Sequence, residues 1–226
     1  KDSSLSLEEA SFVSDINPIC TKDIVVVYHD NKWIVRGIFE FETELIALKP
    51  LHMTFITTYG MIIFSTSTGI YKASLGDKNI ASPIQIMTGV RVIAIKKNML
   101  EDKICFVTAD TIILYDTDSL EIIHTYNVKS LDCKIYNDII WCITDKYEIW
   151  NSESDIETIK CRWHKPYKIK MISERRFVTI DNNNIVFWEY GVNSIFNLPY
   201  TISTHFHITH IFKIYEYYSD IFINRH

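Results

Sequence analysis

Hydrophobic and polar residues alternate along almost the whole chain in short blocks. Runs of four to eight residues rich in Ile, Val, Phe and Tyr are separated by clusters of Asp, Asn, Ser, Thr and Lys. Such residues favour extended backbone, and no stretch holds a helical period for long. The pattern therefore predicts an all-β protein.

One phrase recurs within this pattern. A hydrophobic strand runs to a Thr and an Asp, and a second strand follows that ends on an aromatic and a polar residue. The phrase occupies residues 106–116, 142–151 and 177–189. Alignment on it divides the chain into a polar lead-in and five units with a partial sixth: residues 1–11, 12–49, 50–89, 90–130, 131–165, 166–199 and 200–226. Units of about 40 residues with four strands each are typical of propeller blades.

The units share a register. The equivalent last residues of the third strands are spaced by 36, 44, 35 and 38 residues, and they are Val35, Tyr71, Tyr115, Trp150 and Trp188. In four units this residue lies five positions after the turn residue, as with Asp110 and Tyr115. In the fifth unit the separation from Asp181 is seven, so we expect residues 182–184 to lengthen that turn.

The phrase resembles the WD-repeat family, in which Ser/Thr-x-Asp precedes the hairpin turn and the next strand ends in Trp-Asp. The corresponding pairs here are Tyr115-Asp116, Trp150-Asn151 and Trp188-Glu189. The Gly-His dipeptide that normally precedes the inner strand is absent, and His52 and His164 lie near its place. The resemblance implies a β-propeller of four-stranded antiparallel blades, about five plus a partial sixth. It also implies that the turn residues Asp110, Asp145 and Asp181 accept hydrogen bonds from turn donors.

The two ends of the chain leave the closure of the ring open. Residues 204–216 and 220–224 predict two further strands, after which the sequence stops. Three explanations compete: a sixth blade completed by the N-terminal segment, a fragment of a larger propeller, and an open ring completed by a partner. An unclosed ring exposes strand edges that something must cover.

Charge and cysteine content limit the classes of partner and the cell compartment that we expect for the protein. The net charge of −5 argues against a general nucleic-acid binder, and we interpret the basic stretches at 96–97, 160–170 and 175–176 as solvated strand ends and turns. Five cysteines without paired spacing indicate reduced thiols in an intracellular protein, cytoplasmic or nuclear. No apolar run approaches the length of a membrane helix.

No catalytic signature is present. The sequence has no phosphate-binding glycine loop, no Gly-x-Ser-x-Gly and no Cys-x-x-Cys. We interpret His205, His207 and His210 as imidazoles on a terminal strand, and the acidic clusters as turn residues. The sequence therefore predicts no cofactor, no metal site and no enzyme activity.

These observations favour a non-catalytic scaffold that binds other protein subunits within an intracellular complex. The expected binding surface is the face that carries the hairpin turns and the loops between units. Its residues are Asp30, Asn31, His52, Asp110, Lys129, Asp145, Trp163, His164, Lys165, Asn182 and Asn183, together with Asn184. The alternative is an RNA-associated module in RNA processing or ribosome assembly, suggested by the basic stretch at 160–170, and no membrane insertion is expected.

Overall fold

The computed structural model describes most of the chain between residues 16 and 224. The described residues are 16, 18–21, 23–43, 48–136, 138–153, 158–161, 164–173, 176–191, 194–203, 210–211 and 223–224, with side chains as far as Glu189. They form strands and one short 3-10 helix, η1 (Thr57–Tyr59). Among these residues, no helix is long and apolar enough to cross a lipid bilayer.

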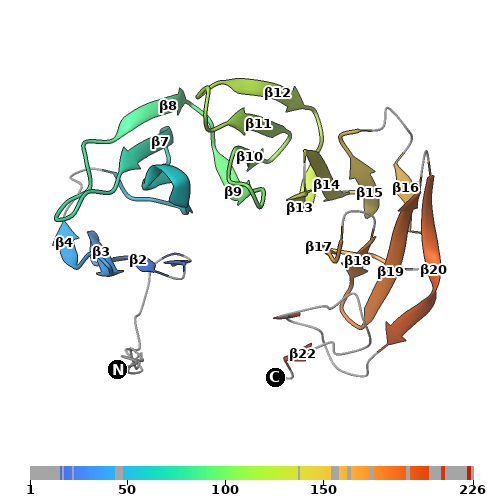
Figure 1. Ribbon diagram of the computed structural model, residues 1–226. Coiled ribbons are helices and arrows are strands. Elements are labelled where there is room, and N and C mark those ends of the chain that lie inside the picture. Colours follow the sequence, from blue (N-terminus) through green and yellow to red (C-terminus); the bar gives the residue numbers. More distant parts are fainter. Residues whose placement is uncertain are drawn as a thin grey trace. The chain divides into compact units, whose positions relative to one another are not determined.

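The strands form five four-stranded sheets, and each strand pairs with its neighbour in sequence in antiparallel fashion (Figure 1). The first sheet contains β1 (Ile19–Cys20), β2 (Ile24–His29), β3 (Lys32–Gly37) and β4 (Phe41–Thr43). The second contains β5 (His52–Ile56), β6 (Met61–Ser65), β7 (Gly69–Ser74) and β8 (Ile84–Thr88). The third contains β9 (Val92–Lys97), β10 (Lys103–Thr108), β11 (Ile112–Asp116) and β12 (Ile122–Tyr126).

The fourth sheet contains β13 (Ser130–Tyr136), β14 (Ile139–Thr144), β15 (Glu148–Asn151) and β16 (Ile159–Lys160). The fifth contains β17 (Lys168–Met171), β18 (Arg176–Ile180), β19 (Asn184–Gly191) and β20 (Ser194–Ser203). A last pair joins β21 (His210–Ile211) and β22 (Ile223–Asn224). The prediction of an all-β fold built from four-stranded antiparallel sheets is confirmed.

Two unit boundaries differ from those expected. Ser130 begins the fourth sheet, because it pairs with Thr144, whereas the sequence placed it in the third unit. The fifth sheet runs to Ser203 instead of residue 199, because the long strand β19 offers Asn184 as a partner to that residue. The lead-in at residues 1–11 lies outside the described residues, and the three explanations of ring closure stay predictions.

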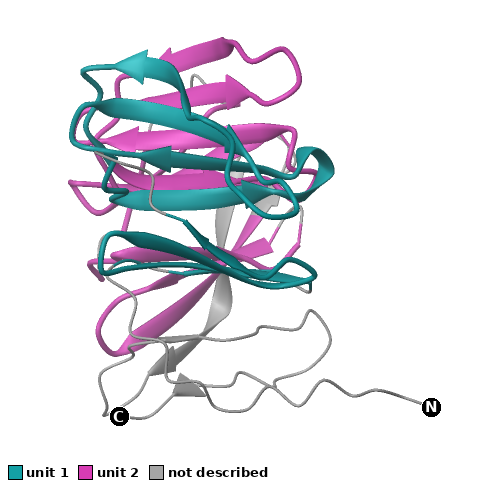
Figure 2. Cartoon of the chain, turned by 90° about the vertical axis from the view of Figure 1, so that its left-hand side faces the viewer, with its two compact units in different colours: residues 1–92 teal, residues 93–226 magenta. Residues whose placement is uncertain are grey.

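The chain divides into two compact units, residues 1–92 and 93–226 (Figure 2). In unit 1 the core lies between the first two sheets. Its centre is the fully buried Trp33, whose ring lies 5.6 Å from that of Tyr28 and 5.2 Å from that of Phe64. Edge-on aromatic pairs of this kind add to the hydrophobic gain from burial.

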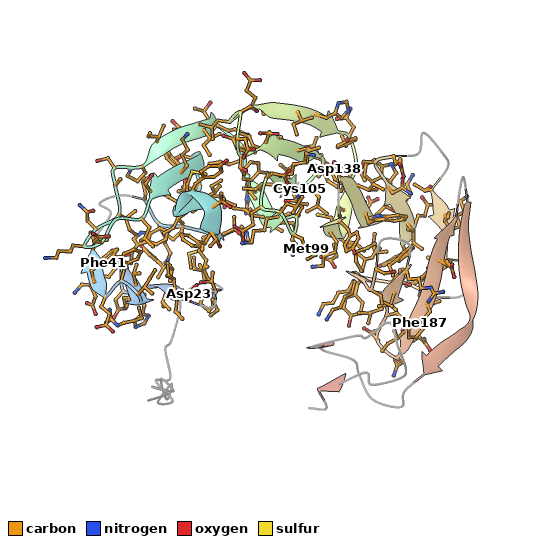
Figure 3. The ribbon with its side chains drawn as sticks, viewed as in Figure 1. Asp23, Phe41, Met99, Cys105, Asp138 and Phe187 are labelled. Carbon is orange, nitrogen blue, oxygen red and sulfur yellow. The ribbon has the colours of Figure 1, made fainter. Side chains whose placement is uncertain are left out.

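Unit 2 contains the third sheet from Ile93 onward and the fourth and fifth sheets. Cys105, Cys133 and Cys142 belong to the core between the third and fourth sheets, and Figure 3 labels Cys105 in strand β10. Between the fourth and fifth sheets, Trp141 packs on Phe177 at 4.9 Å. Because the fourth sheet is covered on both faces in this way, its strand β14 is buried along almost its whole length, which explains why it reads as a hydrophobic run.

Candidate functional site

The topology of unit 2 places three hairpin turns and two loops at the same end of its sheets. In an antiparallel sheet, the turn between the second and third strands and the connection into the first strand meet at one end. We call this surface the turn face of unit 2: the turns at 109–110, 145–147 and 182–183, the loop at 127–129, and the described loop residues 161 and 164–167. Met99 and Asp138, labelled in Figure 3, belong to turns at the opposite end.

Side-chain and backbone contacts join most of the turn face into one surface. The exposed Lys129 pairs with Asp110 across 3.2 Å, and its carbonyl oxygen accepts a hydrogen bond of 3.0 Å from the backbone N–H of Asp145. In the same turn, Tyr147 lies beneath the ammonium group of Lys165, which is 5.7 Å from the ring centre. The structure thus brings together Asp110, Lys129, Asp145 and Lys165 among the residues expected from the sequence.

The turns are held rigidly by short polar side chains at their first positions. Thr108 Oγ1 accepts hydrogen bonds from the backbone N–H groups of Asp110 and Thr111, at 3.3 and 2.9 Å. Asp181 Oδ1 accepts the equivalent bonds from Asn183 and Asn184, at 2.8 and 2.6 Å. Both groups satisfy turn donors that would otherwise lack a partner.

This equivalence corrects the expected register. The backbone N–H of Thr108 donates to the carbonyl of Thr111, and that of Asp181 donates to the carbonyl of Asn184. Both turns therefore have two central residues, and the expectation that residues 182–184 lengthen the fifth turn is wrong. Asp181 corresponds in position to Thr108, not to Asp110. The expected separations of five and seven residues were therefore counted from positions that are not equivalent in the two turns.

The predicted hydrogen-bonding role of the turn Asp holds in one of the three cases. Asp181 does accept turn donors, whereas the carboxylate of Asp110 pairs with Lys129. In the fourth sheet it is the hydroxyl of Thr144 that accepts the backbone N–H of Glu148, at 3.2 Å. That turn has three residues and ends on Tyr147 in the left-handed region, with φ of 61°.

His164 is not available to a partner at the surface. It is 5% exposed, and its Nε2 lies 2.8 Å from Thr179 Oγ1, which also accepts a hydrogen bond of 2.8 Å from Trp188 Nε1. Burial lowers the pKa of His164, although Asp181 opposes this shift. The side chain is therefore neutral at pH 7 and serves the interior of the fifth sheet. Trp163 lies outside the described residues, as do His205 and His207, while the structure gives only the backbone of His210.

The remaining expected residues lie in two places, the turn face and unit 1. Asn182 and Asn183 are exposed in the turn after Asp181. Asp30 and Asn31 belong to unit 1, where they are exposed and form a two-residue turn with φ of 50° and 62°. Such values suit a tight hairpin and are tolerated by Asp and Asn.

His52 also belongs to unit 1, but it does not occupy the place of His164. It is the first residue of β5 and pairs with Ser65, whereas His164 precedes β17 by four residues. The two histidines that lie near the expected Gly-His position are therefore not equivalent in structure.

The cysteine thiols in the core of unit 2 are made unreactive by burial. Burial raises the pKa of Cys133 to about 12 and also raises the pKa of Cys105 and Cys142. Their thiols are thus protonated at neutral pH and are poor nucleophiles. Within the described part of the chain, no three His, Cys, Asp or Glu side chains group as ligands for a metal ion.

Two residues that take part in contacts of this region were not predicted from the sequence. Tyr147 carries Lys165 on its ring, and Thr179 connects His164 to Trp188. The recurring phrase contains Thr179, so the residue itself was visible. What the sequence does not show is that its hydroxyl points into the sheet core, whereas that of Thr108 points into a turn.

Comparisons with known proteins bear on the fold. No family model and no curated protein matches the sequence. Among solved structures, Hsv2 of Kluyveromyces lactis is similar with a TM-score of 0.60 and 12% identity, over 83% of this chain and 72% of that one. A putative 6-phosphogluconolactonase from Bacteroides uniformis gives 0.58 and 11%, over 84% and 71%. The C-terminal WD40 domain of Sif2 gives 0.50 and 9%, over 81% and 70%. The chain thus has the fold of a divergent, WD40-like β-propeller.

Proposed function

We propose that the protein is a non-catalytic scaffold that binds other protein subunits through the turn face of unit 2. The observation that carries this proposal is the continuous exposed surface formed by Asp110, Lys129, Asp145, Tyr147 and Lys165. It presents both signs of charge and an aromatic ring within a few side chains of one another. Surfaces of this mixed kind suit recognition of a folded protein or a peptide.

The rigidity of the surface supports the same proposal. Its turns are fixed by Thr108, Thr144 and Asp181, and each turn joins two strands of a sheet whose central strands are buried. Recognition residues held on a rigid framework lose little conformational entropy when a partner binds. The turn face therefore binds without first having to be ordered.

The absence of catalytic activity is part of the proposal. It is supported by the protonated thiols, by the neutral His164 and by the lack of a candidate metal-ligand group among the described residues. The fold alone does not decide the matter, because one similar structure is named as a putative lactonase. An intracellular location is likewise proposed, since all five cysteines are free thiols.

The test is a capture experiment with three forms of the full chain. Tagged wild-type protein, the charge-reversal variant Lys129→Glu/Lys165→Glu and the control Lys160→Glu are each recovered from lysate of the source cells. Lys160 is an exposed residue of β16, outside the turn face. We expect stoichiometric partners with the wild type and the control, and at least tenfold less with the double variant. Equal recovery with all three forms would contradict the proposed surface.

RNA binding is the second candidate, because Lys165 and Tyr147 combine a cation with an aromatic ring on which a base stacks. A phosphate-dominated complex weakens steeply with salt. Binding of single-stranded RNA that disappears between 50 and 200 mM salt and is abolished by Lys165→Glu would favour this function. Absence of RNA binding at low salt would eliminate it.

A further inference from the structure

Two hairpins lie at the end of the third sheet that is opposite to the turn face. The first joins β9 to β10 through residues 98–102, and the second joins β11 to β12 through residues 117–121. In an antiparallel sheet these two connections meet at the same end. Met99, labelled in Figure 3, belongs to the first of them. We call the surface formed by the two hairpins the hairpin face of unit 2.

Hydrogen bonds join the two hairpins to each other. Thr117, which is buried, donates its backbone N–H to the carbonyl oxygen of Asp102 at 2.8 Å and its hydroxyl to that of Glu101 at 2.9 Å. Within the first hairpin, Asn98 Oδ1 accepts the backbone N–H of Lys103 at 3.2 Å. The hairpin face is therefore held in one arrangement by bonds inside the protein.

The hairpin face exposes three large apolar side chains. Met99 and Leu100 are 85% and 76% exposed, more than any other large hydrophobic residue whose side chain the structure describes, and Leu120 is 41% exposed. Single apolar residues at a surface are ordinary. Adjacent ones on a rigid tip, with a third on the neighbouring hairpin, are typical of a protein contact site.

The backbone of Leu120 shows that this residue is not explained by folding. Its φ of 61° lies in the left-handed region, which glycine or asparagine adopts at lower cost. Its side chain is also too exposed to add much to a core. Glycine or asparagine would therefore give a more stable hairpin, and a leucine at this position points to a role in recognition.

The apolar residues are surrounded by negative charge. The two lysines that flank the first hairpin each form an ion pair, Lys97 with Glu101 and Lys103 with Asp138. Three more carboxylates, in or next to the hairpins, form no ion pair with any residue that the structure describes: Asp102, Asp116 and Glu121. The hairpin face thus combines an apolar centre with an excess of acidic side chains.

This charge decides among the occupants that the surface could take. A second copy of the chain would bring the same negative charge, and nucleic acid and anionic lipid are also negative, so all three would be repelled. Addition of a strand is disfavoured because backbone groups of the turns are hydrogen-bonded within and between the hairpins. The surface instead suits a helix that carries lysine or arginine on both sides of an apolar stripe.

We propose that the hairpin face of unit 2 binds a basic amphipathic helix of another protein. Met99 and Leu100 insert between the apolar side chains of the helix, and the unbranched methionine adapts its shape to them. Leu120 extends this contact, and Glu121 pairs with a lysine or arginine of the helix. The site lies at the opposite end of the sheet from the turn face and does not depend on it.

The experiment measures binding of synthetic helical peptides of about 18 residues to the full chain by titration calorimetry. The probe peptide carries Leu on one face of the helix and Lys on the other. One control peptide has Ser in place of each Leu, and a second has Glu in place of each Lys. We expect the Leu/Lys peptide to bind the wild type, and both control peptides to bind at least about tenfold more weakly.

Two pairs of variants locate the site. Met99→Ser/Leu100→Ser removes the apolar tip, and its control Ile38→Ser removes an exposed isoleucine of unit 1. We expect the first to bind the Leu/Lys peptide at least about tenfold more weakly than the control. Glu121→Lys and Asp77→Lys change the net charge equally, and Asp77 is exposed in unit 1. We expect Glu121→Lys to bind about threefold or more weakly than Asp77→Lys.

All the replaced side chains are exposed, so the melting temperatures of the variants should stay close to that of the wild type. The proposal is wrong if the Leu/Lys peptide does not bind the wild type, or if Met99→Ser/Leu100→Ser binds it as well as Ile38→Ser. It is also wrong if either control peptide binds as tightly as the probe. Binding of phosphatidylcholine vesicles or self-association through Met99 and Leu100, in place of peptide binding, would overturn it as well.

Discussion

The hydrogen bonds around Thr179 offer the sharpest test of the structure. Its hydroxyl is fully buried and serves both Trp188 Nε1 and His164 Nε2, each at 2.8 Å. Replacement by valine keeps the shape of the side chain and removes only the hydroxyl. Thr179→Val therefore leaves two buried polar groups without this partner and creates almost no cavity.

The expected cost follows from the number of groups left unsatisfied. A buried polar group that loses its hydrogen bond costs about 1–3 kcal/mol. For two groups, with some relaxation, we expect Thr179→Val to lower the free energy of unfolding by about 2–4 kcal/mol. This is a large share of the about 5–15 kcal/mol that stabilises an ordinary domain. For a chain of this size it corresponds to a melting temperature lower by about 4–16 °C.

Urea denaturation followed by tryptophan fluorescence measures this change. The matched control is Thr125→Val, because Thr125 is an exposed residue of strand β12, where such a change alters stability by at most about 0.5 kcal/mol. A second comparison places Thr179→Val in a Trp188→Phe background, where the indole donor is already absent. The cost should then fall by about 1 kcal/mol or more, because the two changes act on one contact.

Two results would refute this reasoning. The first is a cost of Thr179→Val no greater than that of Thr125→Val, which would mean that the hydroxyl has no role in stability. The second is an unchanged cost in the Trp188→Phe background, which would mean that Thr179 and Trp188 are not hydrogen-bonded to each other.

Three further predictions concern pH, thiols and backbone. Burial lowers the pKa of His164 below the value of about 6.5 found in unfolded chains, so the unfolded state binds the extra proton. The free energy of unfolding should therefore fall as the pH drops below about 6.5, and it should fall less steeply in His164→Asn. Equal slopes for the two proteins in urea denaturation at a series of pH values would contradict this. Native-state alkylation followed by mass spectrometry should modify the exposed Cys20 readily and the buried Cys105 only on unfolding; comparable rates would disprove the burial. Gly37→Ala should lower the melting temperature far more than Gly89→Ala. A Cβ at residue 37 would lie 2.1 Å from the carbonyl oxygen of Asp23, whereas a Cβ at residue 89 would meet no atom within 4 Å. Similar decreases in melting temperature for the two variants would contradict the packing around residue 37.

The strands could be predicted from the sequence because their side chains meet one requirement. Buried central strands need hydrophobic, β-favouring residues, and these stand out between polar turns. The sequence pattern predicts middle strands at residues 24–29, 61–65 and 176–180, and β2, β6 and β18 have these bounds. Hydrophobic runs carry this information locally, so no knowledge of the neighbouring sheets is needed.

The turn register could not be predicted in the same way. A Thr-x-Asp phrase contains two residues that can accept turn hydrogen bonds, and the identity of these residues does not determine which of them starts the turn. In the third sheet it is Thr108, and in the fifth sheet it is Asp181. Only the strand pairing decides between them, and strand pairing is a property of two segments together.

The contact between Lys96 and Asp132 shows the same limit for side-chain interactions between sheets. Each residue is ordinary in its own strand, and the two are 36 positions apart in the sequence. Their proximity depends on the packing of one sheet edge against the next.

The equivalence of Thr108 and Asp181 has a consequence for how such proteins are detected. A hydrogen bond to a turn N–H requires an oxygen at a given distance from the backbone, and a hydroxyl or a carboxylate supplies it equally well. A comparison that scores residue identity counts this exchange as a mismatch at a signature position. A blade can thus keep its geometry although its sequence no longer contains the residues by which the repeat is recognised. A search for hydrogen-bond acceptor atoms at fixed positions in a hairpin would find relatives that a comparison of residue identities misses.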